Sequence, residues 1–137
     1  MGRMSEQEMR AFLDEPRFGH LVTLQSDGSP QAAPIWFEFR DDRFLVWTSR
    51  STRRFKNIAA DPRVVLSISA EDEPYRYVTV EGTVTVSEVD VKAIAMSLAT
   101  RYKGLDQGTA FVAEHNKDGV SVILVLTPSK LVAWKAD

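Results

Sequence analysis

The sequence contains no cysteine, and this absence removes several kinds of chemistry. Without cysteine there can be no disulfide, thiol nucleophile, iron–sulfur cluster or thiolate zinc site. The two histidines, His20 and His115, lie 95 positions apart, which disfavours a histidine-based metal site or a Ser-His triad. No metal site is predicted, and we expect the remaining chemistry to come from a bound molecule.

Long apolar runs are missing as well. No segment approaches the roughly 20 apolar residues that cross a bilayer, and the N-terminal MGRMSEQEMR lacks the apolar core of a signal peptide. Apolar residues make up 44% and charged residues 26% of the chain, an ordinary composition that argues against disorder. We therefore expect one domain over residues 1–137, in a soluble, cytoplasmic protein with no membrane partner.

The balance of charge excludes one class of partner and suggests another. Seventeen basic and nineteen acidic residues give a net charge of −2, so bulk electrostatics argue against nucleic-acid binding. Residues 40–63 nevertheless contain seven basic and three acidic side chains, a local charge of +4. This local excess favours a compact anionic ligand. A solvated basic helix face is the alternative explanation.

Alternation of apolar and polar residues predicts a mainly β protein. The clearest alternation covers residues 75–86, where Gly82 interrupts the apolar side and indicates a bulge or a bend. Because the first three strands follow one another through short links, they are expected to form an antiparallel meander. Pro128 is expected to end the last strand, with residues 131–134 as a short extended tail. The six predicted strands cover residues 18–25, 31–39, 44–48, 63–69, 75–86 and 120–127.

Three helices are predicted at the margins of the sheet. The first covers residues 5–13, the second begins at residue 51 or 52 and ends at 61, and the third begins within residues 87–90 and ends at 103. Residues 107–117 are expected to add one helical turn. Ser5 and Glu8 form a capping-box pattern at the start of the first helix. Pro62 ends the second and Gly104 the third. The predicted fold is a small, closed, six-stranded antiparallel β-barrel, because a doubly wound sheet would need alternating strands and helices.

The exit of the third predicted strand carries the strongest functional pattern. Hydroxyl side chains, two arginines and the start of a helix converge in one turn, and these groups together suit a phosphate. The sequence has no glycine-rich phosphate loop, so side chains would hold the anion. A capped surface helix is the alternative. We call residues 48–54 the basic turn; its candidate ligands are Thr48, Ser49, Ser51, Thr52, Arg53 and Arg54.

The second predicted strand contains a proline, which cannot donate to a sheet ladder. Pro34 therefore indicates a sheet edge, a bulge or a position facing a ligand. Ala32 and Ala33 leave room for a flat ring against the backbone, and Trp36 or Trp47 could form a wall. Ordinary packing of an edge strand is the alternative.

Three stretches resemble a known family: GHLVTLQSDGSPQAAPIWFEF (residues 19–39), TSRSTRRFKNIAADPRV (48–64) and YVTVEGTVTV (77–86). They are similar to the pyridoxamine 5′-phosphate oxidase-like split β-barrel proteins, also described as flavin/deazaflavin oxidoreductases. The resemblance spans about residues 5–134. It implies a split β-barrel and a homodimer whose cofactor sites lie at the subunit interface. It also implies FMN or the deazaflavin F420 as the cofactor.

The resemblance also implies roles for individual residues. Positions matching Thr48, Ser49, Thr52 and Arg54 hold the cofactor phosphate, and Arg53 and Asn57 would support them, Asn57 by organising the helix start. The family often has Lys where Arg54 stands. The strand along the tricyclic ring is matched by Gln31, Ala32, Ala33, Pro34 and Ile35.

The expected activity is hydride transfer between the cofactor and a small conjugated acceptor, because such a cofactor carries its own redox chemistry. The opening GHLVTL and the segment PIWFEF are closer to the deazaflavin branch, so F420 is the first expectation and FMN the alternative. Haem, no cofactor, and a non-catalytic flavin- or phospholigand-binding module also stay open. Vitamin B6 phosphate oxidation is disfavoured, because the chain lacks the longer C-terminal extension of those enzymes. No catalytic residue is assigned; His20, Tyr75 and Tyr77 are candidates for a proton donor.

Overall fold

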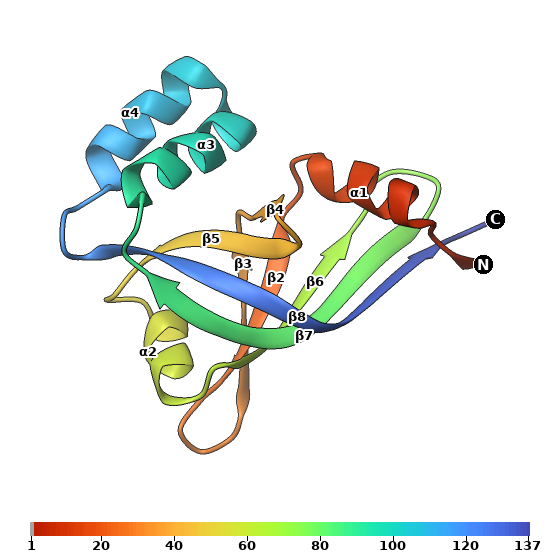
Figure 1. Cartoon of the computed structure of the whole chain (residues 1–137), viewed down its shortest axis with the longest axis horizontal. Helices are drawn as coiled ribbons and strands as arrows, with labels where there is room; N and C mark the ends of the chain where they lie inside the picture. Colours follow the sequence, from red (N-terminus) through yellow and green to blue (C-terminus); the bar gives the residue numbers. More distant parts are fainter. Residues whose placement is uncertain (1) are drawn as a thin grey trace.

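The computed structural model describes residues 2–137, which build a strongly curved antiparallel sheet with helices around it (Figure 1). The strand order is β3-β2-β6-β7-β8-β5-β4, and β1 pairs with the end of β8. The two outermost strands of this order, β3 and β4, are consecutive in the chain, so residues 36–37 link the two edges of the sheet. The strands are β1 (Gly2–Arg3), β2 (Gly19–Leu24), β3 (Pro30–Ile35), β4 (Glu38–Arg40), β5 (Arg43–Ser49), β6 (Arg63–Ser69), β7 (Arg76–Ser87) and β8 (Ser121–Lys135).

The mainly β, antiparallel split-barrel fold is confirmed, but the predicted strand count of six was wrong, because the described residues form eight. The single strand expected over residues 31–39 is divided into β3 and β4. The expected meander was also wrong, since β2–β3 and β4–β5 are hairpins at opposite ends of the strand order. The break at residues 36–37 causes both errors, because it carries the chain from one edge of the sheet to the other.

The last strand does not end at Pro128, as the sequence analysis expected. Along the β7–β8 ladder, Glu81 pairs with Lys130 and Gly82 with Pro128, so Ser129 is an extra residue on β8. This bulge lets the strand continue past a residue that has no N–H group. The bulge expected at Gly82 is confirmed, and the glycine is required there: a Cβ would lie 2.3 Å from the carbonyl oxygen of Thr127.

The interior of the barrel is apolar. Alternate residues of the long strands point inward, and on β7 Val78, Val80 and Val84 are buried while Glu81 and Thr83 are exposed. Helix α1 (Glu6–Asp14) adds Phe12 and Leu13 to the same core. The other fully buried side chains of this core include Phe37, Phe44, Leu66, Ile68 and Leu126.

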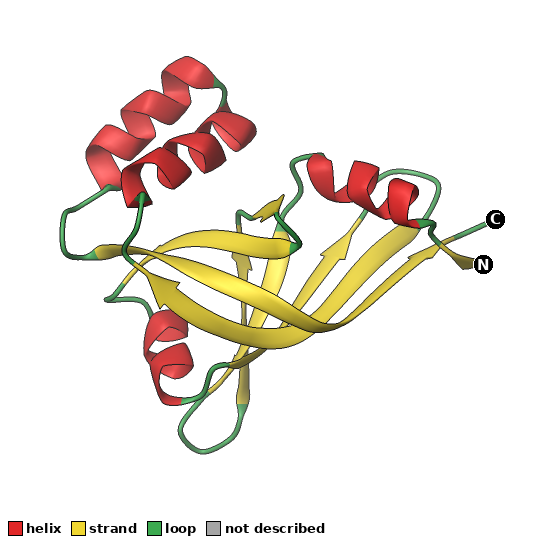
Figure 2. Cartoon of the chain, viewed as in Figure 1, coloured by secondary structure: helices red, strands yellow, loops and turns green. Residues whose placement is uncertain are grey.

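Four helices lie outside the sheet (Figure 2). The capping box of Ser5 and Glu8 in α1 is confirmed, and α2 (Arg53–Ala60) ends before Pro62 as predicted. Helix α3 (Val91–Lys103) ends at Gly104, and α4 (Leu105–His115) directly follows it. None of the helices within residues 2–137 is long and apolar enough to cross a membrane.

Helix α4 is longer than the single turn expected in this region. Its helical period is weak because Gly108 and polar residues interrupt it, and glycine inside a helix is unfavourable by about 1 kcal/mol relative to alanine. In the structure Gly108 is buried, and a Cβ there would lie 2.8 Å from the backbone carbon of Ala99 in α3. The glycine therefore allows two helix backbones to pack closely, and this tertiary contact stabilises a helix that its own sequence does not favour.

Candidate functional site

The basic turn joins the end of β5 to the start of α2. Thr52 is the N-cap of α2: its Oγ1 accepts a hydrogen bond from the Phe55 N–H (3.3 Å) and donates one to the Ser49 carbonyl (2.9 Å). Because the Thr52 hydroxyl proton is used in this way, the hydroxyl of buried Thr48 donates to Thr52 Oγ1 (3.2 Å). Ser49 and Ser51 are joined through their hydroxyls at 2.8 Å. The structure therefore brings together the hydroxyl groups that the sequence indicated.

The start of α2 is electropositive. The first turn of this helix holds no acidic side chain, and its first two residues are Arg53 and Arg54. The N-terminus of a helix already carries a partial positive charge, so two adjacent guanidinium groups add to a field that attracts anions. Arg53 is exposed, whereas Arg54 is partly buried.

Arg54 is the most unusual side chain of the site. Its Nε atom is buried and has no hydrogen-bond partner among residues 2–137. Burial lowers the pKa of the Arg54 guanidinium, although arginine stays charged at any physiological pH. A buried N–H group of a cation that has no partner is costly, because it has lost hydration that nothing in the described protein replaces. An anionic group placed beside Arg54 would remove this cost.

Arg54 reaches a cavity of about 210 Å³, which we call the site cavity. Pro34 and Ile35, from the end of β3, also line it, so three of the expected site residues meet there from distant parts of the chain. The two tryptophans that the sequence offered as walls both line the cavity. Its complete lining is Phe18, Pro34, Ile35, Trp36, Trp47, Arg54 and Phe111.

Asn57 connects the remaining site residues. Its side chain is buried, and its Nδ2 donates to Oγ1 of Thr23 (3.0 Å) and to Oε1 of Gln31 (3.1 Å). The resemblance implied that Asn57 organises the start of the helix, but these contacts join α2 to β2 and β3. Because Asn57 donates to the oxygen of Gln31, this bond sets the orientation of the amide, and both N–H donors of its NH₂ group are left for a ligand. Ala32 and Ala33 lie between Gln31 and Pro34 on β3 and do not line the site cavity.

Sequence reasoning missed two lining residues, Phe18 and Phe111. Phe111 lies on α4, whose length was underestimated, and Phe18 is an exposed ring just before β2. Gly108, one turn before Phe111, was the available signal, since a glycine inside a helix indicates close packing. The candidate proton donors His20, Tyr75 and Tyr77 do not line the site cavity.

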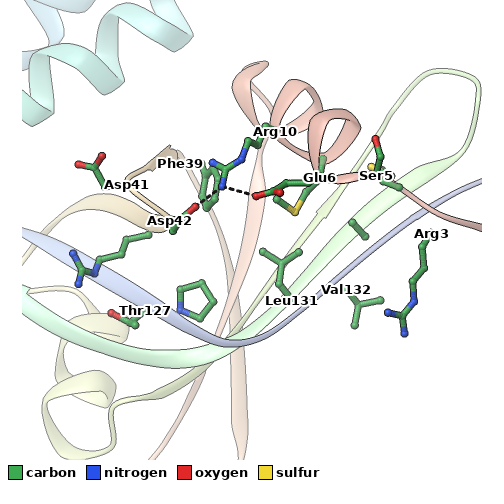
Figure 3. Close-up of a pocket in the computed structure, with 15 residues that line it drawn as sticks. Arg3, Ser5, Glu6, Arg10, Phe39, Asp41, Asp42, Thr127, Leu131 and Val132 are labelled. Carbon is green, nitrogen blue, oxygen red and sulfur yellow. Dashed lines mark hydrogen bonds and ion pairs between the residues drawn. The ribbon is translucent and has the colours of Figure 1, made fainter.

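A larger groove, of about 670 Å³, lies between α1, the β4–β5 turn and the second half of β8 (Figure 3). It shares no lining residue with the site cavity. On its rim Arg10 binds Asp42 (2.6 Å) and Glu6 (3.0 Å), so this guanidinium already has carboxylate partners. The other two arginines that line the groove, Arg3 and Arg43, are exposed, so no arginine of the groove has a buried nitrogen without a partner as Arg54 does.

Comparison with known proteins identifies the group to which this architecture belongs. The family model described as pyridoxamine 5′-phosphate oxidase matches residues 5–135. The chain belongs to this family. Its fold is the family's split barrel, and the family is a flavin-binding group of oxidoreductases.

Individual relatives within and around the family carry different names. The pyridoxine/pyridoxamine 5′-phosphate oxidase of Rubrobacter xylanophilus is 37% identical over 109 residues, which are 78% of this chain and 48% of that protein. The chain thus spans about half the length of this relative. A solved structure described as an F420 reductase is 31% identical, with a TM-score of 0.74, and the match covers 89% of this chain and 94% of that one. The structure of a conserved hypothetical protein from Mycobacterium tuberculosis is 25% identical, with a TM-score of 0.82. This match covers 96% of this chain and 85% of that one.

Proposed function

We propose that this protein is an F420-dependent oxidoreductase that passes a hydride between the deazaflavin and a small conjugated acceptor. The observation that carries this proposal is Arg54, a partly buried cation whose Nε has no partner among the described residues, in a cavity lined with aromatic rings. A cofactor with a phosphate and a flat ring suits both features. FMN, which also has both groups, is the alternative. The F420 reductase at 31% identity supports placing F420 first.

The basic turn would hold the phosphate. Arg54 supplies charge and forked donors, and Arg53 adds a second, exposed guanidinium. Of the hydroxyl groups, that of Thr52 already donates to Ser49 and that of Thr48 to Thr52. These two side chains therefore fix the shape of the turn, while the linked pair of Ser49 and Ser51 keeps one O–H free to donate to an anion.

The strand β3 would hold the ring. Gln31, fixed through its oxygen by Asn57, would direct its NH₂ group to the polar edge of the ring. The small Ala32 and Ala33 and the flat Pro34 leave the backbone open to a planar molecule. Bound there, the cofactor would supply the redox chemistry, a hydride for an acceptor that also takes up one proton.

The residues around the cavity would control water and orientation. Trp36 and Trp47 line the cavity with apolar surface, which would exclude water from the hydride path. Arg54 is the one side chain of the cavity lining that carries a charge, and it cannot act as a proton donor at neutral pH. We therefore propose that solvent supplies the proton to the acceptor.

We further propose a homodimer in which a second copy completes each site. Ligand pockets typically have a volume of roughly 300 to 1,000 Å³. The site cavity, at about 210 Å³, is smaller, so one chain alone would not enclose a tricyclic ring. The outer face of β2 and β6 has a hollow of about 300 Å³ lined by Val22, Leu24 and Val65. Val22 pairs with Ala32 of β3 on one side and with Val65 on the other, so this apolar face is continuous with the ring strand. A second copy on this face would reach the site.

The test is a titration of the purified protein with F420, with FMN and with inorganic phosphate. Two of the three tryptophans line the cavity, so ring binding should quench tryptophan fluorescence, and calorimetry gives the Kd. We expect F420 to bind at least about tenfold more tightly than FMN. The reverse order would establish the FMN alternative, and failure of both cofactors to bind would overturn the proposal.

Turnover separates an enzyme from a non-catalytic binding module. The cavity lining contains no side chain able to donate a proton near neutral pH, which is the observation that favours a module. The pre-reduced cofactor is therefore mixed with a quinone in the presence and absence of the protein. Acceleration by the protein supports the oxidoreductase, whereas tight cofactor binding without acceleration supports the module.

A further inference from the structure

Phe111 lies on α4, far in the chain from the basic turn and the ring strand, yet it lines the same cavity as Arg54 and Pro34. We infer that Phe111 sets the size limit of the acceptor and restricts it to small, flat, conjugated molecules of one ring, for which quinones of different size serve as probes. This inference rests on the proposed function, since it concerns the molecule that receives the hydride.

The ring of Phe111 connects the two tryptophans of the cavity. Its centroid lies 5.1 Å from that of Trp36, with the rings tilted by 46°, and 5.9 Å from that of Trp47, with the rings nearly edge-on at 81°. These are favourable aromatic geometries. The three rings together form one continuous aromatic wall.

The position of Phe111 is set by the helix pair α3–α4. Buried Gly108 brings the backbone of α4 against Ala99 of α3. Val112, next to Phe111, is buried in a small core with Ala95 and Ala99, separate from the core of the barrel. Trp36 and Trp47 pack against this small core, so the helix pair meets the barrel through the aromatic wall. Figure 1 shows α3 and α4 lying together at one end of the sheet, away from α1.

Both tryptophans of the wall have further packing contacts within the fold. Trp36 is stacked on Tyr102 at 5.1 Å and 7°, and the Tyr102 hydroxyl donates to the Arg17 carbonyl at 2.6 Å. Trp47 lies within β5, where its backbone position pairs with Ile123 of β8. Both rings also pack against the small core of α3 and α4, so a larger molecule would have to disturb that core to displace them.

Phe111 differs from the tryptophans in what lies behind it. His115, an exposed residue one turn further along α4, stacks on its ring at 4.0 Å and 23°. The ammonium of exposed Lys103 lies 5.2 Å from the ring centroid. A shorter side chain at position 111 would therefore extend the cavity toward these exposed side chains, and no strand would have to shift. A bulkier side chain at position 111 would shorten the cavity.

The test compares Phe111→Ala and Phe111→Trp with the wild type. Leu105→Ala is the control, because Leu105 is an exposed apolar residue of the same helix and does not line the cavity. Each protein is loaded with oxidised cofactor, which cannot reduce a quinone, and calorimetry measures the binding of a one-ring and a three-ring quinone. The kcat/KM values with pre-reduced cofactor are measured as a second readout.

We expect Phe111→Ala to bind the three-ring quinone about tenfold or more tightly than the wild type does, with the Kd of the one-ring quinone changed less than about threefold. Phe111→Trp should weaken binding of the one-ring quinone by about tenfold, and Leu105→Ala should match the wild type. If Phe111→Ala does not fold, as judged by circular dichroism, the opposite effect of Phe111→Trp still tests the inference.

The cofactor Kd, measured first on every protein, distinguishes the two levels of failure. If the wild type binds neither F420 nor FMN, the proposed function fails and this inference fails with it. If the cofactor binds all variants equally while neither substitution changes the preference between the two quinones, the inference is wrong and the proposed function stands.

Discussion

The side-chain amide of Asn57 donates a 3.1 Å hydrogen bond to Oε1 of Gln31, which precedes it by 26 residues. The same amide nitrogen donates to the buried hydroxyl of Thr23. One residue of α2 thus holds the ring strand β3 and its neighbour β2. The phosphate end and the ring end of the proposed cofactor site are therefore fixed relative to each other by a single buried amide.

Replacing Asn57 by Ala should lower the free energy of unfolding by about 1–3 kcal/mol, because buried Thr23 and partly buried Gln31 both lose their donor. Urea unfolding followed by circular dichroism measures the change. Asn116→Ala serves as the control, since the side chain of Asn116 makes no hydrogen bond in the described chain and its Oδ1 is already unsatisfied. An unfolding free energy equal to that of the wild type would show that the amide does not hold the strands.

Replacing Arg54 by Met should have opposite effects on stability and on binding. Without ligand, the variant should be equal to the wild type or about 1 kcal/mol more stable, because a partly buried guanidinium whose Nε has no partner is replaced by an apolar side chain. Cofactor binding should weaken by about 1.5–3 kcal/mol, or roughly ten- to a hundredfold, through the loss of a charge-assisted hydrogen bond. Calorimetry with the cofactor and thermal unfolding without it measure the two effects.

Arg53→Met is the matched control for this experiment. Arg53 is the neighbouring arginine at the start of α2, and its side chain is exposed. Its replacement should weaken cofactor binding by less than Arg54→Met does. Equal losses in the two variants would mean that general electrostatic attraction holds the phosphate, and that the position of Arg54 has no special role.

Local structure could be predicted from the sequence wherever a short segment determines it. The Ser5–Glu8 capping box and the Thr52 N-cap depend on residues within one turn, and both form as expected. The hydroxyls of the basic turn lie together for the same reason, because they are neighbours in the chain. The alternation in β7 also fixes which side chains point inward, since neighbouring side chains of a strand face opposite sides.

The errors concern contacts between distant segments. No residue pattern within 31–39 shows that β3 and β4 lie at opposite ends of the strand order, because that arrangement depends on β8 pairing with both β7 and β5. Phe111 was missed because its place in the cavity depends on the close packing of α4 on α3 at Gly108. The direction of the Asn57 side chain likewise depends on Thr23, 34 residues earlier.

Arg101 should be important for stability, because its guanidinium connects three parts of the fold. From α3 it donates to the carbonyls of Leu13 (2.8 Å), Asp14 (2.6 Å) and Glu15 (2.8 Å) at the end of α1, and to that of Phe37 (3.1 Å) between β3 and β4. These carbonyls include those that a helix leaves unsatisfied at its C-terminus.

The Arg101→Ala variant should therefore unfold with a free energy about 2–4 kcal/mol below that of the wild type. Arg101→Lys should recover part of this loss, because a single ammonium cannot reach all the carbonyls that a planar guanidinium reaches. Lys92→Ala, at an exposed position of the same helix, is the control and should change stability by less than about 0.5 kcal/mol. Equal stability of Arg101→Ala and the control would contradict this role.

Gly82 should tolerate no side chain. A Cβ at this position would lie 2.3 Å from the carbonyl oxygen of Thr127, so β7 and β8 would have to separate at their bulge. We expect Gly82→Ala to lower the free energy of unfolding by about 3 kcal/mol or more, or to prevent folding. Gly2→Ala is the control, because nothing lies within 4 Å of a Cβ there. A melting temperature of Gly82→Ala within a few degrees of the wild type would show that the bulge can rearrange.

The contact between Glu8 and Lys135 should make the protein sensitive to acid. The Glu8 carboxylate accepts hydrogen bonds from the Lys135 ammonium and from the Ser5 N–H, and they lower its pKa from 4.5 to about 2. Because the pKa is lower in the folded state than in the unfolded state, the stabilisation is complete above about pH 4.5 and is lost as the pH falls toward 2. Asp61, whose pKa is lowered to about 2 by Arg63, adds acid sensitivity in the same range.

The contribution of Glu8 is therefore measured as a difference between wild type and Glu8→Gln, in which Asp61 is unchanged. Urea midpoints are determined from pH 7 to pH 2. The wild type should be the more stable protein above pH 5, and the difference should shrink steadily between pH 4.5 and pH 2, since the protonated carboxyl resembles the amide. Glu114→Gln, at an exposed position of α4, should show a difference near zero throughout. A constant difference across the whole range would mean that Glu8 stabilises the protein by packing or capping, and that its charge is not involved.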